Sequence, residues 1–296
     1  MSFELYSPSR IEQINSYLNE SVGQFRQSSS QRFSLLIDAM QYSLEAGGKR
    51  LRPLLLLATG EALGLSNRSL MPAAAAIEYI HTYSLIHDDL PALDDDDTRR
   101  GKPSNHKKFG EAVAILAGDA LLTEAFSQMM KLSESGTFPP AQIIAATEFL
   151  SNHAGVRGMV GGQIIDVTLD IQSVSLPEIE FIHIHKTGAM IVASIMIPTK
   201  LATMDASVIQ KFKRYGEALG LAFQISDDIL DSEAVIRYSR GPRKKPKPSY
   251  SDVMSPSEMK EKLNLLIDTA IQSVESLGDK SKALVDIANF VRTRRN

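Results

Sequence analysis

The sequence contains no cysteine and no tryptophan. Without cysteine, disulfide bonds, thiolate zinc sites and cysteine nucleophiles are all excluded. Aromatic residues make up only 6% of the chain, which argues against a platform of aromatic rings for binding sugars or bases. Functional chemistry must therefore come from other side chains.

The chain also lacks an excess of one charge and a long hydrophobic run. Lys and Arg number 32 and Asp and Glu number 35, so the net charge of −3 argues against non-specific binding of nucleic acid. The longest apolar stretches, such as residues 189–198, are far short of the ~20 residues that span a bilayer, so we expect no transmembrane segment. The opening residues MSFELYSPSR lack the basic and apolar segments of a signal peptide, and we expect a cytoplasmic location.

Helical periodicity runs through almost the whole chain, whose 296 residues are 43% hydrophobic and 23% charged. We find no internal repeat and no low-complexity linker. We therefore predict one all-α domain over residues 1–296, with a mobile basic loop at about 232–255. The pattern predicts helices over residues 69–90, 110–132, 139–153, 157–169, 176–186, 188–203, 206–231, 256–276 and 280–293.

One acidic motif, FQISDDILD, ends the helix predicted over residues 206–231. Asp227 and Asp231 are four residues apart, so a helix places both carboxylates on one face, where they repel each other. Their neighbours are apolar, which indicates a half-buried face in need of a cation. An all-oxygen ligand set favours Mg²⁺ over zinc or copper.

A second acidic motif, HDDLPALDDDD, follows the Ala-rich helix. A regular helix would turn Asp94 away from Asp88, because six residues rotate the chain by about 240°. Pro91 breaks the helix and lets Asp94 swing back towards Asp88. His81 lies seven residues before Asp88 and is expected on the same face.

Two carboxylate clusters indicate Mg²⁺ ions whose coordination is completed by substrate phosphates, which points to a diphosphate ligand. Basic groups for its remaining charge are available in GGKRLRP at 47–53 and in Arg99 and Arg100. Each motif alone has a plainer interpretation, since an acidic run is usually a solvated loop and a single DDxxD is weak evidence. Together they favour the diphosphate site.

Several segments now identify a family. They are GGKRLRP at 47–53, IHTYSLIHDDLPALDDDDTRRGKPSNHKKFGEAVAILAGDALL at 80–122, GGQIIDV at 161–167, HKTGAM at 185–190 and GLAFQISDDILD at 220–231. In this order they resemble the trans-isoprenyl diphosphate synthases (the polyprenyl synthetases), and within them the bacterial farnesyl diphosphate synthases.

The resemblance implies the isoprenoid synthase fold, a helical bundle around a central cavity, in a homodimer with three Mg²⁺ ions that Mn²⁺ can replace. It implies condensation of isopentenyl diphosphate with an allylic diphosphate. Its motifs assign metal binding to Asp88, Asp94, Asp227 and Asp231. They assign the isopentenyl diphosphate site to Lys49, Arg52, His81 and Arg100. Contacts to the allylic diphosphate fall to Arg99, Lys186 and Lys247, and the catalytic group comprises Lys186, Thr187 and Gln224.

Product length has a steric interpretation. Tyr83 lies five residues before Asp88, about 7.5 Å along the helix axis, where its ring would form the floor of the tunnel for the growing chain. This predicts a 15-carbon product, farnesyl diphosphate. Geranyl or geranylgeranyl diphosphate is the alternative product, and Tyr83 is otherwise a plain core aromatic.

The loop after DDILD departs from the family pattern. It reads SEAVIRYSRGPRKKPKPSYSDVM, with Pro246 where the family has glycine before its second lysine. This departure leaves open a rival function, a catalytically weak partner subunit of another prenyl synthase. The two intact acidic motifs favour an active enzyme and argue against a terpene cyclase.

Overall fold

The computed structural model describes residues 3–28, 30–169, 174–238 and 248–294, and it confirms the all-α prediction. The only strands in these ranges are a short antiparallel pair, β1 (Thr98–Arg99) and β2 (Lys102–Pro103). The helices are α1 (Phe3–Ser28), α2 (Ser34–Leu44), α3 (Leu51–Ala62), α4 (Asn67–Asp88), α5 (Asn105–Phe109), α6 (Glu111–Met130), α7 (Pro140–Ala154), α8 (Met159–Thr168), α9 (Leu176–His183), α10 (Ala189–Leu201), α11 (Ala206–Tyr238), α12 (Pro256–Glu275) and α13 (Lys282–Thr293).

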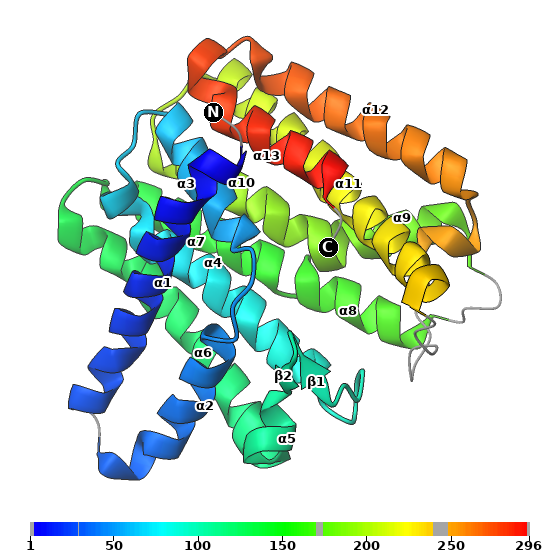
Figure 1. Cartoon of the computed structure of the whole chain (residues 1–296). Coiled ribbons are helices and arrows are strands. Elements are labelled where there is room, and N and C mark those ends of the chain that lie inside the picture. Colours follow the sequence, from blue (N-terminus) through cyan, green and yellow to red (C-terminus); the bar gives the residue numbers. More distant parts are fainter. Residues whose placement is uncertain (1–2, 29, 170–173, 239–247, 295–296) are drawn as a thin grey trace.

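Helices α4 and α10 occupy the middle of the bundle (Figure 1). α4 packs against α3 and α6, while α10 packs against α3, α7 and α11. α12 and α13 cover α11 on one side, and α1 and α2 lie on the other side of the molecule (Figure 1). The two central helices therefore carry their polar residues into the interior of the fold.

Helix α4 can lie at the centre because much of it is alanine. Ala73, Ala74 and Ala76 are fully buried, and such small side chains let neighbouring helices approach closely. Ser66 caps the start of the helix by accepting a hydrogen bond from the backbone N–H of Ser69. The helix ends at Asp88, three residues before the proline. Its C-terminal end thus presents the first acidic motif.

The expected break between α9 and α10 is absent. Ile184–Gly188 forms a π-helical segment (η4) that joins the two helices into one rod, Leu176–Leu201. A π turn is rare and is often found at functional sites. The rod is long and apolar enough to cross a membrane, but 67% of its most apolar window is buried inside the protein. Core packing therefore explains its apolar character.

The bounds of 232–255 predicted for the basic loop are wrong on both sides of the undescribed residues 239–247. α11 continues to Tyr238, so residues 232–238 are helical and not part of a loop. After the undescribed stretch, Tyr250–Asp252 forms a 3₁₀ turn in which Tyr250 is fully buried. The remaining basic residues, Lys247 among them, lie outside the described ranges.

Candidate active site

The first acidic motif folds back on itself at the end of α4. The backbone N–H of Asp94 donates to the carbonyl of Asp88 at 2.8 Å, and the N–H of Asp96 donates to that of Asp89 at 3.2 Å. The predicted return of Asp94 towards Asp88 is therefore correct. Both side chains line a cavity of about 440 Å³, which we call the acidic cavity.

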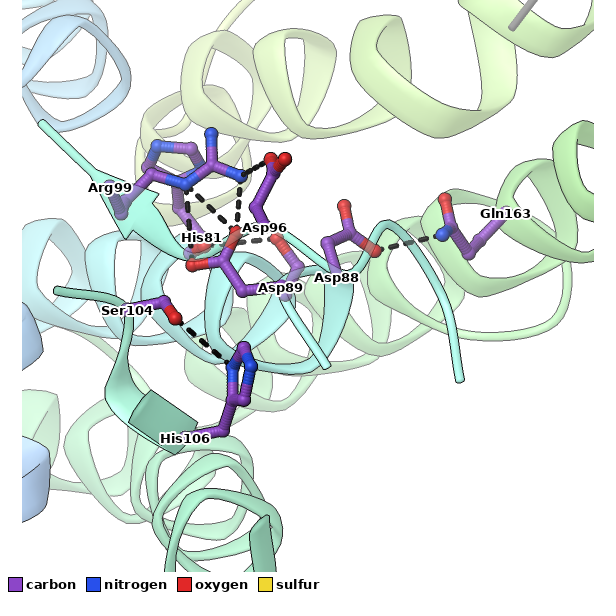
Figure 2. A network of polar contacts seen from close by, with 9 residues as sticks. His81, Asp88, Asp89, Asp96, Arg99, Ser104, His106 and Gln163 are labelled. Carbon is purple, nitrogen blue, oxygen red and sulfur yellow. Dashed lines mark hydrogen bonds and ion pairs between the residues drawn. The ribbon is translucent and has the colours of Figure 1, made fainter. Parts of the chain in front are cut away.

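The carboxylates on this wall are held by side chains from other elements (Figure 2). Gln163 of α8 donates to Asp88 at 2.8 Å. Arg99 of β1 donates through Nε to Asp89 at 3.0 Å and through its Nη2 to both Asp89 and Asp96. Burial raises the pKa of Asp89, although the Arg99 guanidinium opposes the effect. Asp89 thus serves to orient Arg99, which also lines the acidic cavity.

The second acidic motif forms the opposite wall, on α11. Asp227 and Asp228 line the acidic cavity, whereas Asp231 is exposed and is not among the residues that line it. Asp227 pairs with Arg294 at 2.8 Å, and burial raises the pKa of its carboxyl despite that arginine. Asp88, Asp94 and Asp227 therefore face one cavity, and the charge of Asp231 further raises the pKa of Asp227.

Asp228 has a different structural role from Asp227. It is 6% exposed, and its two oxygens accept hydrogen bonds from the backbone N–H of Tyr250 at 2.7 Å and from Gln224 Nε2 at 3.1 Å. Burial raises the pKa of Asp228 to about 6. The residue anchors the turn that follows the basic segment, and Pro248 and Ser249 at the start of this turn also line the acidic cavity.

The three predicted catalytic residues meet at this cavity. Lys186 Nζ donates to Asp166 at 2.5 Å, and Thr187 Oγ1 donates to Gln224 Oε1 at 3.0 Å. Burial alone would lower the pKa of Lys186, but the carboxylates of Asp88 and Asp166 outweigh it and raise the pKa.

The π-helical segment carries Lys186 and Thr187, and the close packing of α8 against it fixes its position. A Cβ on Gly162 of α8 would come within 2.3 Å of the Lys186 backbone nitrogen. Only glycine therefore lets α8 lie so close to this segment.

A second cavity has a volume of about 370 Å³. We call it the basic pocket; it is lined by Lys49, Arg52, His81 and Arg100, with Phe223 of α11 beside them. Arg52 Nε is buried and has no hydrogen-bond partner among the described residues. Burial and the nearby arginines lower the pKa of His81 well below its usual value, so its imidazole is neutral. His81 lines this pocket, whereas Asp88 lines the acidic cavity.

Arg100 lines the basic pocket because a glycine leaves room for its side chain. Its Nη1 donates to the carbonyl of Gly47, and a Cβ on Gly48 would lie 2.6 Å from the guanidinium carbon. Gly48 also has a positive φ of 129°. The GGKRLRP motif thus combines a backbone conformation that only glycine readily adopts with room for Arg100.

Comparison with known proteins agrees with this geometry. The sequence profile of the polyprenyl synthetase family matches residues 33–253. The chain belongs to the polyprenyl synthetase family. The chain is 45% identical to the farnesyl diphosphate synthase of Geobacillus stearothermophilus over 86% of its own length and 87% of that protein.

Two further relatives carry different names. A geranylgeranyl diphosphate synthase of Cyanophora paradoxa is 40% identical, with 89% of both chains covered. The crystal structure of a geranyltransferase from Legionella pneumophila superposes with a TM-score of 0.88 at 32% identity, covering 98% of this chain and 96% of that one. The family therefore fixes prenyl transfer but not the length of the product.

The residues of this polyprenyl synthetase fit a divalent metal that arrives with a diphosphate. Within the described ranges, no three His, Asp or Glu side chains converge to form a metal cage by themselves. Asp88, Asp94 and Asp227 nevertheless offer only oxygen ligands to one cavity. Mg²⁺ prefers one or two carboxylates completed by water and phosphate oxygens, so this donor set suits it.

Four residues of the site were given no role in the sequence analysis. Gln163 and Asp166 lie within GGQIIDV, a motif that we matched without assigning roles to its residues. Asp228 was seen only as a member of its motif, and Arg294 carried no signal at all. Tyr83 is buried, at 6% exposure, but lines neither of the two cavities.

Proposed function

We propose that this polyprenyl synthetase is a farnesyl diphosphate synthase. It condenses isopentenyl diphosphate first with dimethylallyl and then with geranyl diphosphate, releasing pyrophosphate each time. The observation that carries the proposal is the pair of cavities, one basic and one acidic, which are lined by the consecutive residues Phe223 and Gln224 of α11 respectively. We take Mg²⁺ as the metal, three ions as their number, and Mn²⁺ as a substitute.

The two cavities suit two different diphosphates. The carboxylates of the acidic cavity can hold a diphosphate only through a metal, so this cavity suits the allylic substrate whose C–O bond must break. The basic pocket offers Lys49, Arg52 and Arg100 directly, so it suits isopentenyl diphosphate, which keeps its diphosphate. The unpartnered nitrogen of Arg52 supports an anion there, because a buried donor without an acceptor costs about 1–3 kcal/mol.

Residues of the chain stabilise the charge that develops during transfer. Bound Mg²⁺ supplies neutralisation of the departing pyrophosphate. Lys186 and Arg99 add fixed positive charge in the same cavity, where exclusion of water strengthens each interaction. The oxygens of Thr187 and Gln224 provide dipoles for the allylic carbocation. Attack by the isopentenyl double bond forms the new C–C bond, and the released pyrophosphate is positioned to take the proton.

The proposal of a 15-carbon product depends on Tyr83. Its ring packs edge-on against His87, with centroids 5.8 Å apart, and His87 Nε2 lies 3.0 Å from the carbonyl of Ile115 on α6. A Cβ on Gly118 would collide with the His87 ring, so α6 backs this pair closely. Because Tyr83 is supported from behind, it can act as a firm floor for the growing chain.

Product analysis tests the proposal. The purified chain is incubated with Mg²⁺, labelled isopentenyl diphosphate and either dimethylallyl or geranyl diphosphate, and the dephosphorylated products are separated by chromatography. We expect a 15-carbon alcohol from both starters. A main product of 10 or 20 carbons would make it a geranyl or geranylgeranyl diphosphate synthase, and no turnover by the chain alone would favour the partner-subunit function.

Two variants test the assignment of the cavities. Arg52→Gln should raise KM for isopentenyl diphosphate, and Arg99→Gln should raise KM for the allylic substrate. Arg26→Gln is the matched control, since Arg26 is an exposed residue that pairs with Asp38 on the surface. If both variants raised the same KM, the division between the two cavities would be wrong.

We also propose a homodimer. Leu116 and Met130 of α6 and Ile144 of α7 are exposed, and these two helices pack against each other. Light scattering after gel filtration should give twice the mass of the chain, and Leu116→Glu should reduce it if α6 lies in the interface. The cytoplasmic location stays a prediction.

A further inference from the structure

Arg294 follows the last helix, α13, and reaches into the wall of the active site. Its Nη2 lies 2.8 Å from Asp227 Oδ1 and donates to the carbonyl of Phe223 at 2.7 Å. Its Nε donates to Ser226 Oγ at 2.9 Å. A residue near the end of the chain is thus attached to the second acidic motif at three points.

The burial of the Arg294 side chain distinguishes this contact from a surface ion pair. The Arg294 side chain is 4% exposed, whereas Asp227 remains 40% exposed towards the cavity. The guanidinium carbon lies 4.0 Å from the centre of the Phe223 ring, a cation–π distance. Arg294 is therefore fully packed, while the carboxylate it holds stays open to an incoming ion.

The same arginine acts on the basic pocket. Phe223, which supports the guanidinium, lines that pocket. Burial comes first among the causes that lower the pKa values of Lys49 and Arg52, and the Arg294 charge lowers both further. Arg294 therefore contacts the carboxylate that would bind metal, and its charge also acts on the cations that would bind an anion.

We propose that Arg294 competes with the divalent metal for Asp227 and, once displaced, turns across the Phe223 ring towards an anion in the basic pocket. The inference rests on the proposed function for the identity of the two ligands. Mutual repulsion drives the exchange, because a guanidinium and a divalent ion cannot share one carboxylate without cost. An anion in the basic pocket then favours metal binding at Asp227, which couples the two substrate sites.

Mn²⁺ binding measured by electron paramagnetic resonance tests the competition without any turnover. In the absence of diphosphate, Arg294→Gln should bind one Mn²⁺ about tenfold more tightly than the unchanged chain, a typical effect of removing a close charged competitor. Adding isopentenyl diphosphate alone should tighten Mn²⁺ binding by the unchanged chain and have little effect on the variant.

Two controls assign the effect to this contact. Arg292→Gln removes a neighbouring arginine that pairs with Asp268 on α12, so its Mn²⁺ affinity should equal that of the unchanged chain. In an Asp227→Asn background, Arg294→Gln should have no further effect, because the ligand for which the two cations compete is gone. Circular dichroism establishes that each variant is folded.

Arg294→Lys carries the test if the glutamine variant does not fold. A lysine keeps the charge but lacks the planar fork that reaches Asp227, Ser226 and the Phe223 carbonyl together, so Mn²⁺ should bind more tightly by a smaller factor. Unchanged or weaker Mn²⁺ binding in a folded Arg294 variant would overturn the inference. That result would leave the proposed function standing, because product analysis tests it separately.

Discussion

Replacement of Asp228 by Asn should change how the stability of the protein depends on pH. Burial raises the pKa of this carboxyl to about 6 from its ordinary value of 3.8. Between these pH values the folded protein keeps a proton that the unfolded chain has released. Stability is therefore fully present below pH 4 and falls as the pH rises through 6, the opposite of the usual behaviour of an aspartate.

The size of the effect follows from the difference of about two pH units. Each unit corresponds to about 1.4 kcal/mol, so the Asp228 carboxyl costs the folded state ~3 kcal/mol by pH 7. Its side chain is only 6% exposed, so solvent screening does not reduce this value much. Asn cannot titrate. The free energy of unfolding of Asp228→Asn, relative to the unchanged chain, should therefore rise by up to ~3 kcal/mol from pH 4 to pH 7.

Urea unfolding followed by far-ultraviolet circular dichroism, in EDTA and at several pH values, measures this difference. Any constant loss from the amide that faces Tyr250 or Gln224 shifts all points equally and does not affect the slope. Asp205→Asn, at an exposed position before α11, is the matched control for an ordinary Asp to Asn change. The free energy of unfolding of Asp228→Asn is compared with that of the unchanged chain from pH 4 to pH 7. If the difference between the two varies by less than about 0.5 kcal/mol, the structural role given to Asp228 is refuted.

Three other predictions concern the metal ligands, the catalytic hydroxyl and the length of the product. Asp88→Ala and Asp227→Ala should each lower turnover by roughly 10³ in a steady-state assay, since each removes a carboxylate for the metal. Thr187→Val keeps the side-chain volume but removes the hydroxyl, so kcat should fall about tenfold or more while both KM values stay within about twofold. Tyr83→Ala should lengthen the product to 20 carbons and beyond, because each added CH₂ gains about 0.8 kcal/mol on burial, and bulk at Ser84 should shorten it. Chromatography of the dephosphorylated products decides the last case, and an unchanged 15-carbon product from Tyr83→Ala would assign the length to another residue.

Local patterns in the sequence predicted the parts of the site that depend on local geometry. Pro91 breaks α4, and the return of Asp94 follows from that break. The helical period also placed most helices within a few residues of their observed ends. Such features depend on a residue and its near neighbours, and the sequence displays those directly.

The parts that could not be predicted depend on contacts between distant segments. Arg294 meets Asp227 across 67 positions of the chain, and no periodicity indicates which residue fills a given wall. Asp228 is anchored by the backbone N–H of Tyr250, which lies 22 positions further along the chain. The π-helical segment likewise arises from packing, since α8 and α11 press against it at Gly162 and Gly188.

The π-helical segment Ile184–Gly188 has a consequence for insertions and deletions. A π turn holds one residue more than an α turn, so it absorbs a single added residue without bending the rod. Deleting one residue here would let the rod become α-helical throughout, with the two flanking helices kept in register and only the residues of the turn itself reoriented. Backbone hydrogen bonding would improve, yet Lys186 and Thr187 would no longer both face the cavity. The loss of a single codon should therefore yield a stable, folded protein that is inactive, which separates the requirements of the fold from those of catalysis.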